Sequence, residues 1–190
     1  MKAMPLEVNS LSLGDLTTTG KGTKQIPLRC KDGLLKLQPG PLRVLWQPQA
    51  YNEPTATRVP ICFESTPEVE DYINTLDDWV IKALAAGSQS YFGGTLTVDQ
   101  VRDKYTSSLK MSQKGYKALK AKMNIAGRAS ARFWSPGAHR PGAPPEDWTN
   151  CVVEPILEIR GIWFLGKEMG LLVELTEALV TENSVACPFG

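Results

Sequence analysis

This chain of 190 residues contains 1 His and 4 Cys, and no two of the cysteines are close in sequence. Cys30, Cys62, Cys151 and Cys187 stand far apart, whereas a structural zinc site usually has paired ligands a few residues apart. His139 stands in a Pro/Gly-rich stretch and gives little support for a Ser/His or Cys/His catalytic pair. We therefore expect no metal, no cofactor and no catalytic site, and cysteines that are reduced and buried.

Long apolar runs and secretion signals are also missing. No stretch approaches the roughly 18 apolar residues of a membrane span. The first residues contain no apolar core of signal-peptide length, and the sequence has no N-x-[ST] glycosylation acceptor. We therefore expect an intracellular protein, located in the cytoplasm, the nucleus, or a viral factory or virion, that is not secreted and does not bind a membrane.

Charge is balanced overall but unevenly distributed along the chain, whose net charge is +1. Residues 101–140 carry 10 Lys/Arg and 1 Asp/Glu, whereas residues 64–100 carry 1 and 7, and residues 141–190 carry 2 and 8. A basic segment between two acidic ones indicates an anionic partner. The 42% hydrophobic and 22% charged composition is that of a globular protein, not of a disordered one.

The first third of the chain is expected to form short strands. Residues 1–22 form an irregular lead-in that ends in a polar run. Residues 24–38 predict a β-hairpin, because two apolar segments flank Lys31-Asp32-Gly33 and Asp-Gly is a strong two-residue turn signal. Residues 42–46 and 58–64 predict two further strands.

Two helices are expected in the middle. Residues 66–86 form the clearer one, with Thr66 as N-cap, Pro67 in the first turn and apolar residues at spacings of three and four. A second helix is predicted over about 97–109, because Thr97 and the glutamine three residues later have capping-box spacing.

The basic segment that follows allows two interpretations. Apolar and lysine residues alternate over 116–126, which favours a half-buried strand, while the intrinsic propensities of Ala, Lys, Leu and Met favour a helix. Residues 128–134 alternate as well. Residues 135–148 form a long proline- and glycine-rich loop, a kind of loop that is often functional.

The C-terminal third predicts a long hairpin of residues 151–165 and 169–180, with a bulge or an edge at Pro155. Strands early and late, with helices between them, predict an α+β fold that is mainly antiparallel β. We expect one domain over residues 23–182 and a C-terminal tail over residues 183–190.

The basic segment has the two features that binding of single-stranded nucleic acid requires, which are cations for phosphates and flat rings for bases. The opposite interpretation is that the lysines only cover the solvent-exposed face of a sheet and that the aromatic rings belong to the core. The candidate phosphate-binding residues are Lys117, Lys120, Lys122, Arg128, Arg132 and Arg140, and the candidate stacking residues are Phe133 and Trp134.

Several segments resemble the single-stranded DNA-binding proteins of nucleocytoplasmic large DNA viruses, typified by the protein of African swine fever virus. The order and spacing of these segments agree over roughly residues 20–180. The segments are GTKQIPLRCKDGLLKLQPGPLRV, EVEDYINTLDDWVIKAL, KALKAKMNI and GIWFLGKEMGLLVEL.

The resemblance implies an OB-like barrel core with two inserted helices, in a viral protein of DNA replication that binds single-stranded DNA with little sequence preference. It places Lys24, Arg29 and Lys36 on the binding surface beside the lysine strand. The loop at 135–147 departs from the family pattern, which leaves the role of Trp134 and Arg140 open.

Three hypotheses follow. The first is binding of single-stranded DNA, with RNA as the alternative ligand. The second is a structural protein that forms homo-oligomers or filaments through basic–acidic contacts and exposed strand edges. The third is an enzyme with dispersed carboxylates, although no motif supports it. The carboxylates considered are Asp77, Asp78, Glu154 and Glu158.

Overall fold

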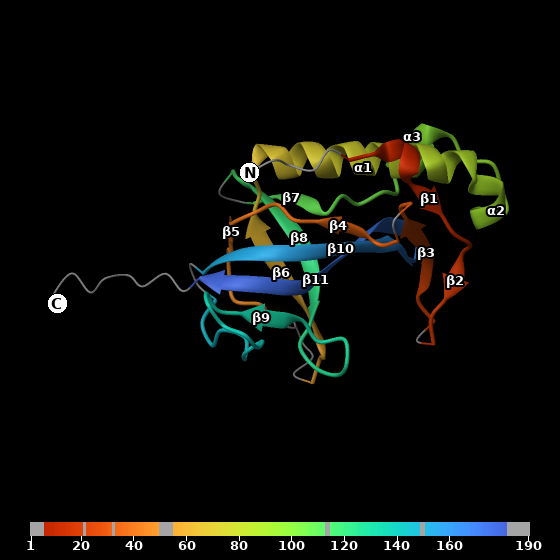
Figure 1. Cartoon of the computed structure of the whole chain (residues 1–190). Coiled ribbons are helices and arrows are strands. Elements are labelled where there is room, and N and C mark those ends of the chain that lie inside the picture. Colours follow the sequence, from red (N-terminus) through yellow and green to blue (C-terminus); the bar gives the residue numbers. More distant parts are fainter. Residues whose placement is uncertain are drawn as a thin grey trace, which may run out of the picture.

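A long β-hairpin forms the centre of the fold in the computed structural model, which describes residues 6–20, 22–31, 33–49, 55–112, 115–148 and 151–181. Strand β10 (Val152–Leu165) pairs antiparallel with β11 (Glu168–Thr181), so the predicted C-terminal hairpin is confirmed (Figure 1). The register shifts at Ile156/Leu157, directly after Pro155, and again at Ile159/Gly161.

Three short strands follow one another along the free edge of β10. They are β3 (Lys24–Arg29), β4 (Leu35–Leu37) and β5 (Leu42–Arg43), and each pairs antiparallel with β10. The predicted hairpin over 24–38 is therefore wrong. Cys30 and Gly33 do form a tight turn through reciprocal backbone hydrogen bonds of 2.9 and 3.0 Å. The flanking segments pair with β10 instead of each other, because this longer strand offers both of them a partner.

The predicted lysine strand is confirmed as β8 (Lys117–Asn124), which lies between β6 (Arg58–Glu64) on one edge and β7 (Leu109–Met111) and β11 on the other. Strand pattern outweighed helix propensity because alternate residues of β8 are buried. The strand expected over 128–134 is restricted to β9 (Arg132–Trp134). Both β8 and β9 run parallel to β11, so the sheet is mixed.

The sheet is not closed into a barrel by paired strands. Its order is β1-β3-β10-β11-β8-β6, with β1 (Ser12–Leu13) and β2 (Thr17–Thr18) beside β3. The two ends approach each other after β5, where Val44 and Phe63 form an isolated bridge and the Leu45 N–H donates to the Cys62 carbonyl at 3.0 Å. The expected OB-like barrel is thus an open mixed sheet in the described part of the chain.

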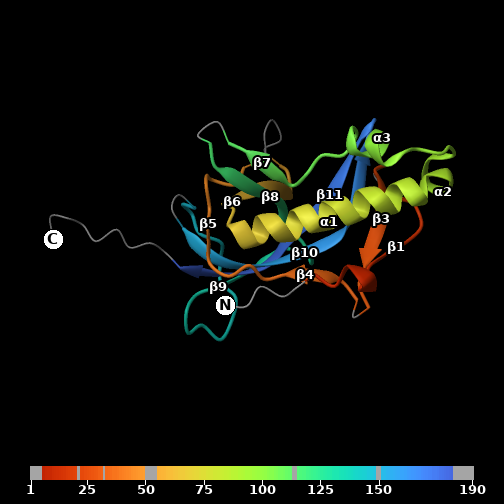
Figure 2. The ribbon, with the colours of Figure 1, turned by 90° about the horizontal axis from the view of Figure 1, so that it is seen from above.

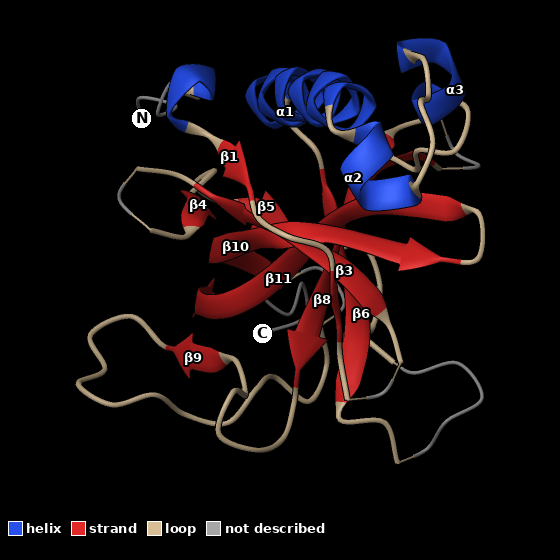
Figure 3. Ribbon diagram, turned by 90° about the vertical axis from the view of Figure 1, so that its right-hand side faces the viewer, coloured by secondary structure: helices blue, strands red, loops and turns tan. Residues whose placement is uncertain are grey.

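All the described helices lie on one side of the sheet (Figures 1 and 3). Helix α1 (Pro67–Ala86) has Thr66 as N-cap, as predicted, and runs across the sheet (Figure 2). The predicted second helix has its capping box at Thr97 but ends early, as α3 (Val98–Arg102). The chain after α3 instead runs beside Met169 of β11, as the Tyr105–Met169 bridge shows. Two short helices were not expected: α2 (Ser88–Phe92) and the 3-10 helix Val8–Ser10. The short strands β1, β2 and β7 were not expected either, and β1 and β2 lie within residues 1–22, which were expected to be irregular.

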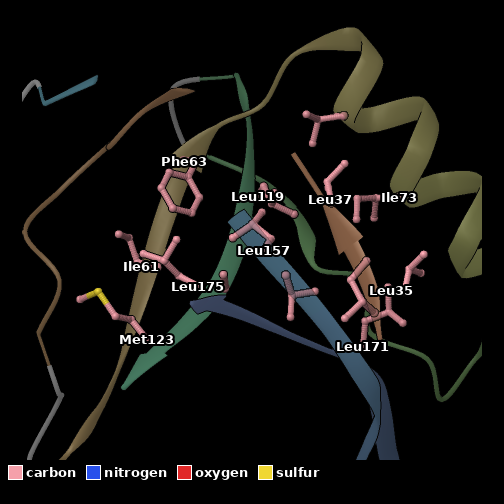
Figure 4. Packing of buried hydrophobic residues seen from close by; sticks show 14 of the residues in the cluster. Leu35, Leu37, Ile61, Phe63, Ile73, Leu119, Met123, Leu157, Leu171 and Leu175 are labelled. Carbon is pink, nitrogen blue, oxygen red and sulfur yellow. The ribbon is translucent and has the colours of Figure 1, made fainter. Parts of the chain in front are cut away.

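The hydrophobic core fills the space between α1 and the sheet. Ile73 of α1 lies in one cluster with Leu35 and Leu37 of β4 and with Phe63 and Leu119 from the other end of the sheet (Figure 4). Because side chains alternate along a strand, the remaining residues of β6 and β8 point away from the core. We call that side of the sheet, opposite α1, the outer face.

Candidate nucleic-acid interface

A groove of about 460 Å³ lies on the outer face over β6, β7 and β8. Its floor consists of every second residue of β6 and β8, because side chains alternate between the two faces of a strand. The segment after β5 and the end of β7 form its walls. The lining residues are Trp46, Ala56, Arg58, Pro60, Cys62, Lys110, Met111, Ser112, Ala118, Lys120 and Lys122.

The charged residues that line the groove are all cations: Arg58, Lys110, Lys120 and Lys122. Among the described ion pairs, the only one made by these four joins Arg58 to Glu174 at 3.8 Å. Burial lowers the pKa of Lys122, and the nearby charges of Lys120 and Arg58 lower it further. Positive charges that repel one another in this way are stabilised when an anion enters the groove.

Trp46 gives the groove an aromatic surface. Trp46 is 42% exposed, although large apolar residues are usually covered, and it lies in the same groove as the Cys62 thiol, whose pKa it helps to lower. Burial raises the pKa of Cys62 despite the opposing effects of Lys120 and Lys122, so the thiol stays protonated near neutral pH. Cations beside an accessible ring are the combination that a single strand needs, because phosphates meet the cations and bases stack on the ring.

The lysines of β8 are divided between the two faces of the sheet. Lys120 and Lys122 line the groove, whereas Lys117 alternates with the core residues and its Nζ lies 2.6 Å from a Glu70 carboxylate oxygen on α1. Lys117 is therefore neutralised by α1 and lies away from the groove.

The two predicted stacking residues also lie outside the groove. Phe133 is 5% exposed and packs edge-on against Trp148 at 5.5 Å between ring centroids, so its ring belongs to the core. Trp134 is half-buried, and its Nε1–H donates to Glu177 at 3.0 Å. It lines a smaller pocket of about 270 Å³ that also contains Glu154 and Glu177. Two carboxylates make that pocket unfavourable for a phosphate.

The remaining predicted cations are scattered. Arg128 and Arg140 are exposed in the loops on either side of β9, and Arg132 pairs with Glu177. Lys24 and Arg29 are exposed at the two ends of β3. Lys36 on β4 lies 3.7 Å from Glu158 of β10.

Among the charged and aromatic residues that line the groove, three were not predicted: Arg58, Lys110 and Trp46. Arg58 follows the alternation of the strand 58–64, so the pattern could have indicated it. Lys110 lies on a strand of three residues, directly after the range 97–109 that was expected to be helical, and so short a strand shows no alternation. Trp46 stands at the end of the predicted strand 42–46, and only the fold brings it above Cys62.

Other kinds of site find little support in the described ranges. No group of three or more His, Cys, Asp and Glu side chains is placed there to hold a metal ion. The described helices are all too short or too polar to cross a membrane. The carboxylates considered for catalysis contact other groups: Asp77 accepts a hydrogen bond from Tyr105, Asp78 pairs with Lys82 and Arg102, and Glu158 pairs with Arg160. Glu154 lines the pocket beside Trp134.

Comparison with known proteins identifies a shared fold. No protein-family model matches the chain, and no curated protein matches it either. Among solved structures, it resembles the single-stranded DNA-binding protein from bacteriophage Enc34 in complex with ssDNA, with a TM-score of 0.51 and 12% identity over 93% of this chain and 98% of the phage chain. A C-terminal truncation of that protein gives a TM-score of 0.48 and 11% identity over 90% and 94%. The likeness shows the fold and does not single out the large-DNA-virus family, so membership of that family stays a prediction.

Proposed function

We propose that this chain binds single-stranded DNA, without sequence preference, in the groove over β6, β7 and β8. The observation that carries the proposal is the lining itself, which combines four cations with an accessible indole and includes no carboxylate. Phosphates would lie against Lys110, Lys120 and Lys122, and a base would stack on Trp46. Contacts to phosphates and ring faces read no base edges, which accounts for the lack of sequence preference.

The shared fold supports the same proposal. The phage protein that this chain resembles was solved with ssDNA, and the likeness extends over nearly the whole length of both chains. OB folds bind nucleic acid on the surface of their sheet. The open sheet of this protein could bind a strand in the same way, because the proposed groove lies over β6, β7 and β8 and does not depend on closure of a barrel. The proposal assigns no chemical reaction to the protein.

The first test reverses the charge of the groove floor. In the variant Lys120→Glu/Lys122→Glu, two cations become carboxylates that repel phosphate, so affinity for fluorescent oligo-dT should fall at least about 100-fold at low salt, equally for other sequences. Trp46→Ala should cost about 1–3 kcal/mol of binding free energy. Fluorescence anisotropy with oligo-dT, matched RNA and duplex at two salt concentrations measures both effects.

The matched control is Lys82→Glu/Lys104→Glu, which makes the same charge change on the helical side of the molecule. Lys82 is on α1 and Lys104 follows α3, and both side chains are exposed. If binding depended only on total charge, the two double variants would lose affinity equally. That result, or unchanged binding by the groove variant, contradicts the proposal. Tighter binding to duplex than to single strands contradicts it as well.

A further inference from the structure

Trp163 of β10 lies across the outer face, on the opposite half of the sheet from the groove. It pairs with Gly170 of β11, whose neighbours Met169 and Leu171 are buried in the core, so Gly170 and Trp163 share the outer face. A Cβ at Gly170 would lie 3.0 and 3.1 Å from two indole carbons. The indole therefore packs against the Gly170 backbone, where the Thr106 carbonyl oxygen also approaches, to 2.4 Å from the position of a Cβ.

The indole is held in that orientation by a hydrogen bond. Its Nε1–H donates to the Leu171 carbonyl at 3.1 Å, which satisfies the only polar atom of the side chain. Trp163 is half-buried, so one side of the ring packs on the sheet while part of the side chain remains accessible. A fixed aromatic ring with its polar atom already bonded is a suitable platform for stacking, because binding requires no rearrangement.

A chain of ion pairs extends from Arg58 in the groove to Arg160, three residues before Trp163 on β10. Arg58 and Arg160 both contact Glu174, at 3.8 and 2.6 Å, and Arg160 also contacts Glu158 at 3.0 Å. The arginine side chains are 39% and 40% exposed, whereas those of Glu174 and Glu158 are 6% and 12% exposed. The cations thus cover the carboxylates, and a phosphate that passes over this region meets guanidinium groups.

Arg160 lies in a β-bulge of strand β10. The register shifts between Ile159, which pairs with Val173, and Gly161, which pairs with Leu172, so Arg160 is the extra residue of a β-bulge. Bulges redirect a side chain and often occur beside functional sites. Here the bulge lies between the ion-pair chain and Trp163.

The separation matches a short stretch of nucleic acid. Lys122 pairs with Glu174 and Trp163 pairs with Gly170, so the two positions are separated by four residues along β11 and by two strand spacings. In a flat sheet this corresponds to roughly 16 Å. About five nucleotides of a stacked strand, at roughly 3.4 Å per phosphate, cover that length. The result lies within the range of about 4–16 nucleotides that OB folds occupy.

We propose that the bound strand leaves the groove, crosses the sheet over Arg160 and stacks a further base on Trp163. This inference rests on the proposed function and extends it, because it makes the outer face one continuous site with two aromatic platforms, Trp46 and Trp163.

Photo-crosslinking tests the path directly in the wild-type protein. Oligo-dT of about 3 and about 20 nucleotides, substituted with 5-iodouracil, is irradiated in the complex, and the linked residues are identified by mass spectrometry. We expect links to Trp46 with both lengths and links to Trp163 with the longer one. Links to Trp46 without any link to Trp163 at either length overturn the inference and leave the proposed function intact.

A variant supplies the energetic test. Trp163→Leu keeps an apolar side chain over Gly170 but removes the ring, so it should weaken the longer oligonucleotide about 5- to 100-fold and leave the shorter one nearly unchanged. Trp79→Leu on α1, another half-buried tryptophan, is the control and should change neither affinity. Equal loss for both lengths, or no loss, overturns the inference. If the wild-type chain binds neither oligonucleotide, the proposed function fails as well.

Discussion

Lys117, Lys120 and Lys122 occupy one strand, yet they lie in two different surroundings. Alternation places Lys120 and Lys122 in the groove and Lys117 on the core side, where Glu70 of α1 neutralises it. The aromatic residues show the same effect. Phe133 looks like a stacking residue because it is close in sequence to the basic residues, but it is buried, whereas Trp46 is distant in sequence and exposed in the groove.

Asp77 provides a prediction at the residue scale. Burial raises its pKa above the ordinary value of 3.8, although hydrogen bonds from Ser107 and Tyr105 oppose the shift. A carboxyl whose folded-state pKa is raised favours folding while it is protonated, and this contribution is lost as the pH rises through the folded-state pKa. At neutral pH the buried charge therefore reduces stability.

Asp77→Asn should for that reason be at least as stable as the wild type at pH 7, because the amide can accept the hydrogen bond from Tyr105 without a charge. The stability difference should shrink as the pH falls toward 4, where the wild-type carboxyl becomes protonated. Urea unfolding at several pH values measures this, with Asp78→Asn as the exposed control. If Asp77→Asn were less stable than the wild type at pH 7 and this deficit disappeared as the pH fell, the ionised carboxylate would be the stabilising form and the prediction would be wrong.

Each of the two long β-strands, β10 and β11, pairs along one edge with several shorter β-strands. Strands β3, β4 and β5 pair one after the other with β10, from Phe164 to Val152. Residues 122–134 follow β11 in the same way, with an excursion at 125–131. The Asp-Gly turn signal, whose Asp32 lies outside the described residues, is therefore not followed by the second strand of a hairpin.

Gly161 provides the prediction at the element scale, because β3 passes very close to it. A Cβ at this position would overlap the Ile26 carbonyl oxygen and lie 3.0 Å from the Cα of Pro27. Both atoms belong to the backbone, so β3 would have to move. We expect Gly161→Ala to lower the free energy of unfolding by about 1–3 kcal/mol or more.

Gly94→Ala is the matched control, because a Cβ at that glycine meets nothing within 4 Å. Thermal and urea unfolding of both variants measures the difference. If Gly161→Ala were as stable as Gly94→Ala, β3 and β10 would not be packed as closely as described.

At the scale of the whole molecule, the edges of the central hairpin are occupied. β10 is covered by β3, β4 and β5, and β11 by β8 and β9. The assembly hypothesis required these edges to be exposed, so its edge-strand premise does not hold for the described residues. Contacts between the basic and acidic regions of neighbouring copies stay a prediction.

Light scattering tests that prediction. We expect the protein without nucleic acid to scatter as a monomer of 20.9 kDa at both low and high salt. With oligo-dT, the logarithm of affinity should fall with the logarithm of salt concentration at a slope of about −3, if four phosphates are neutralised in the groove. Large assemblies that dissolve as salt is added, together with a flat salt dependence of binding, would favour the assembly hypothesis.

The sequence by itself determined features that depend on local pattern. These include α1 with its Thr66 cap, the C-terminal hairpin and the basic character of the middle segment. Over 116–126 the pattern left strand and helix open, and only the pairing of β8 with its neighbours decided for the strand. Caps, alternation and charge are properties of neighbouring residues, so they can be recognised without knowing the fold. The resemblance to single-stranded DNA-binding proteins also rested on such patterns.

Only the tertiary structure decided which residues meet. Trp46 and Arg58 join Lys120 because the segment after β5 passes over β6 and because β6 pairs with β8, both of which are long-range contacts. The partner of β3 depended in the same way on a strand more than one hundred residues away. Pairing between distant segments is set by the total burial of the core, which no short stretch of sequence encodes.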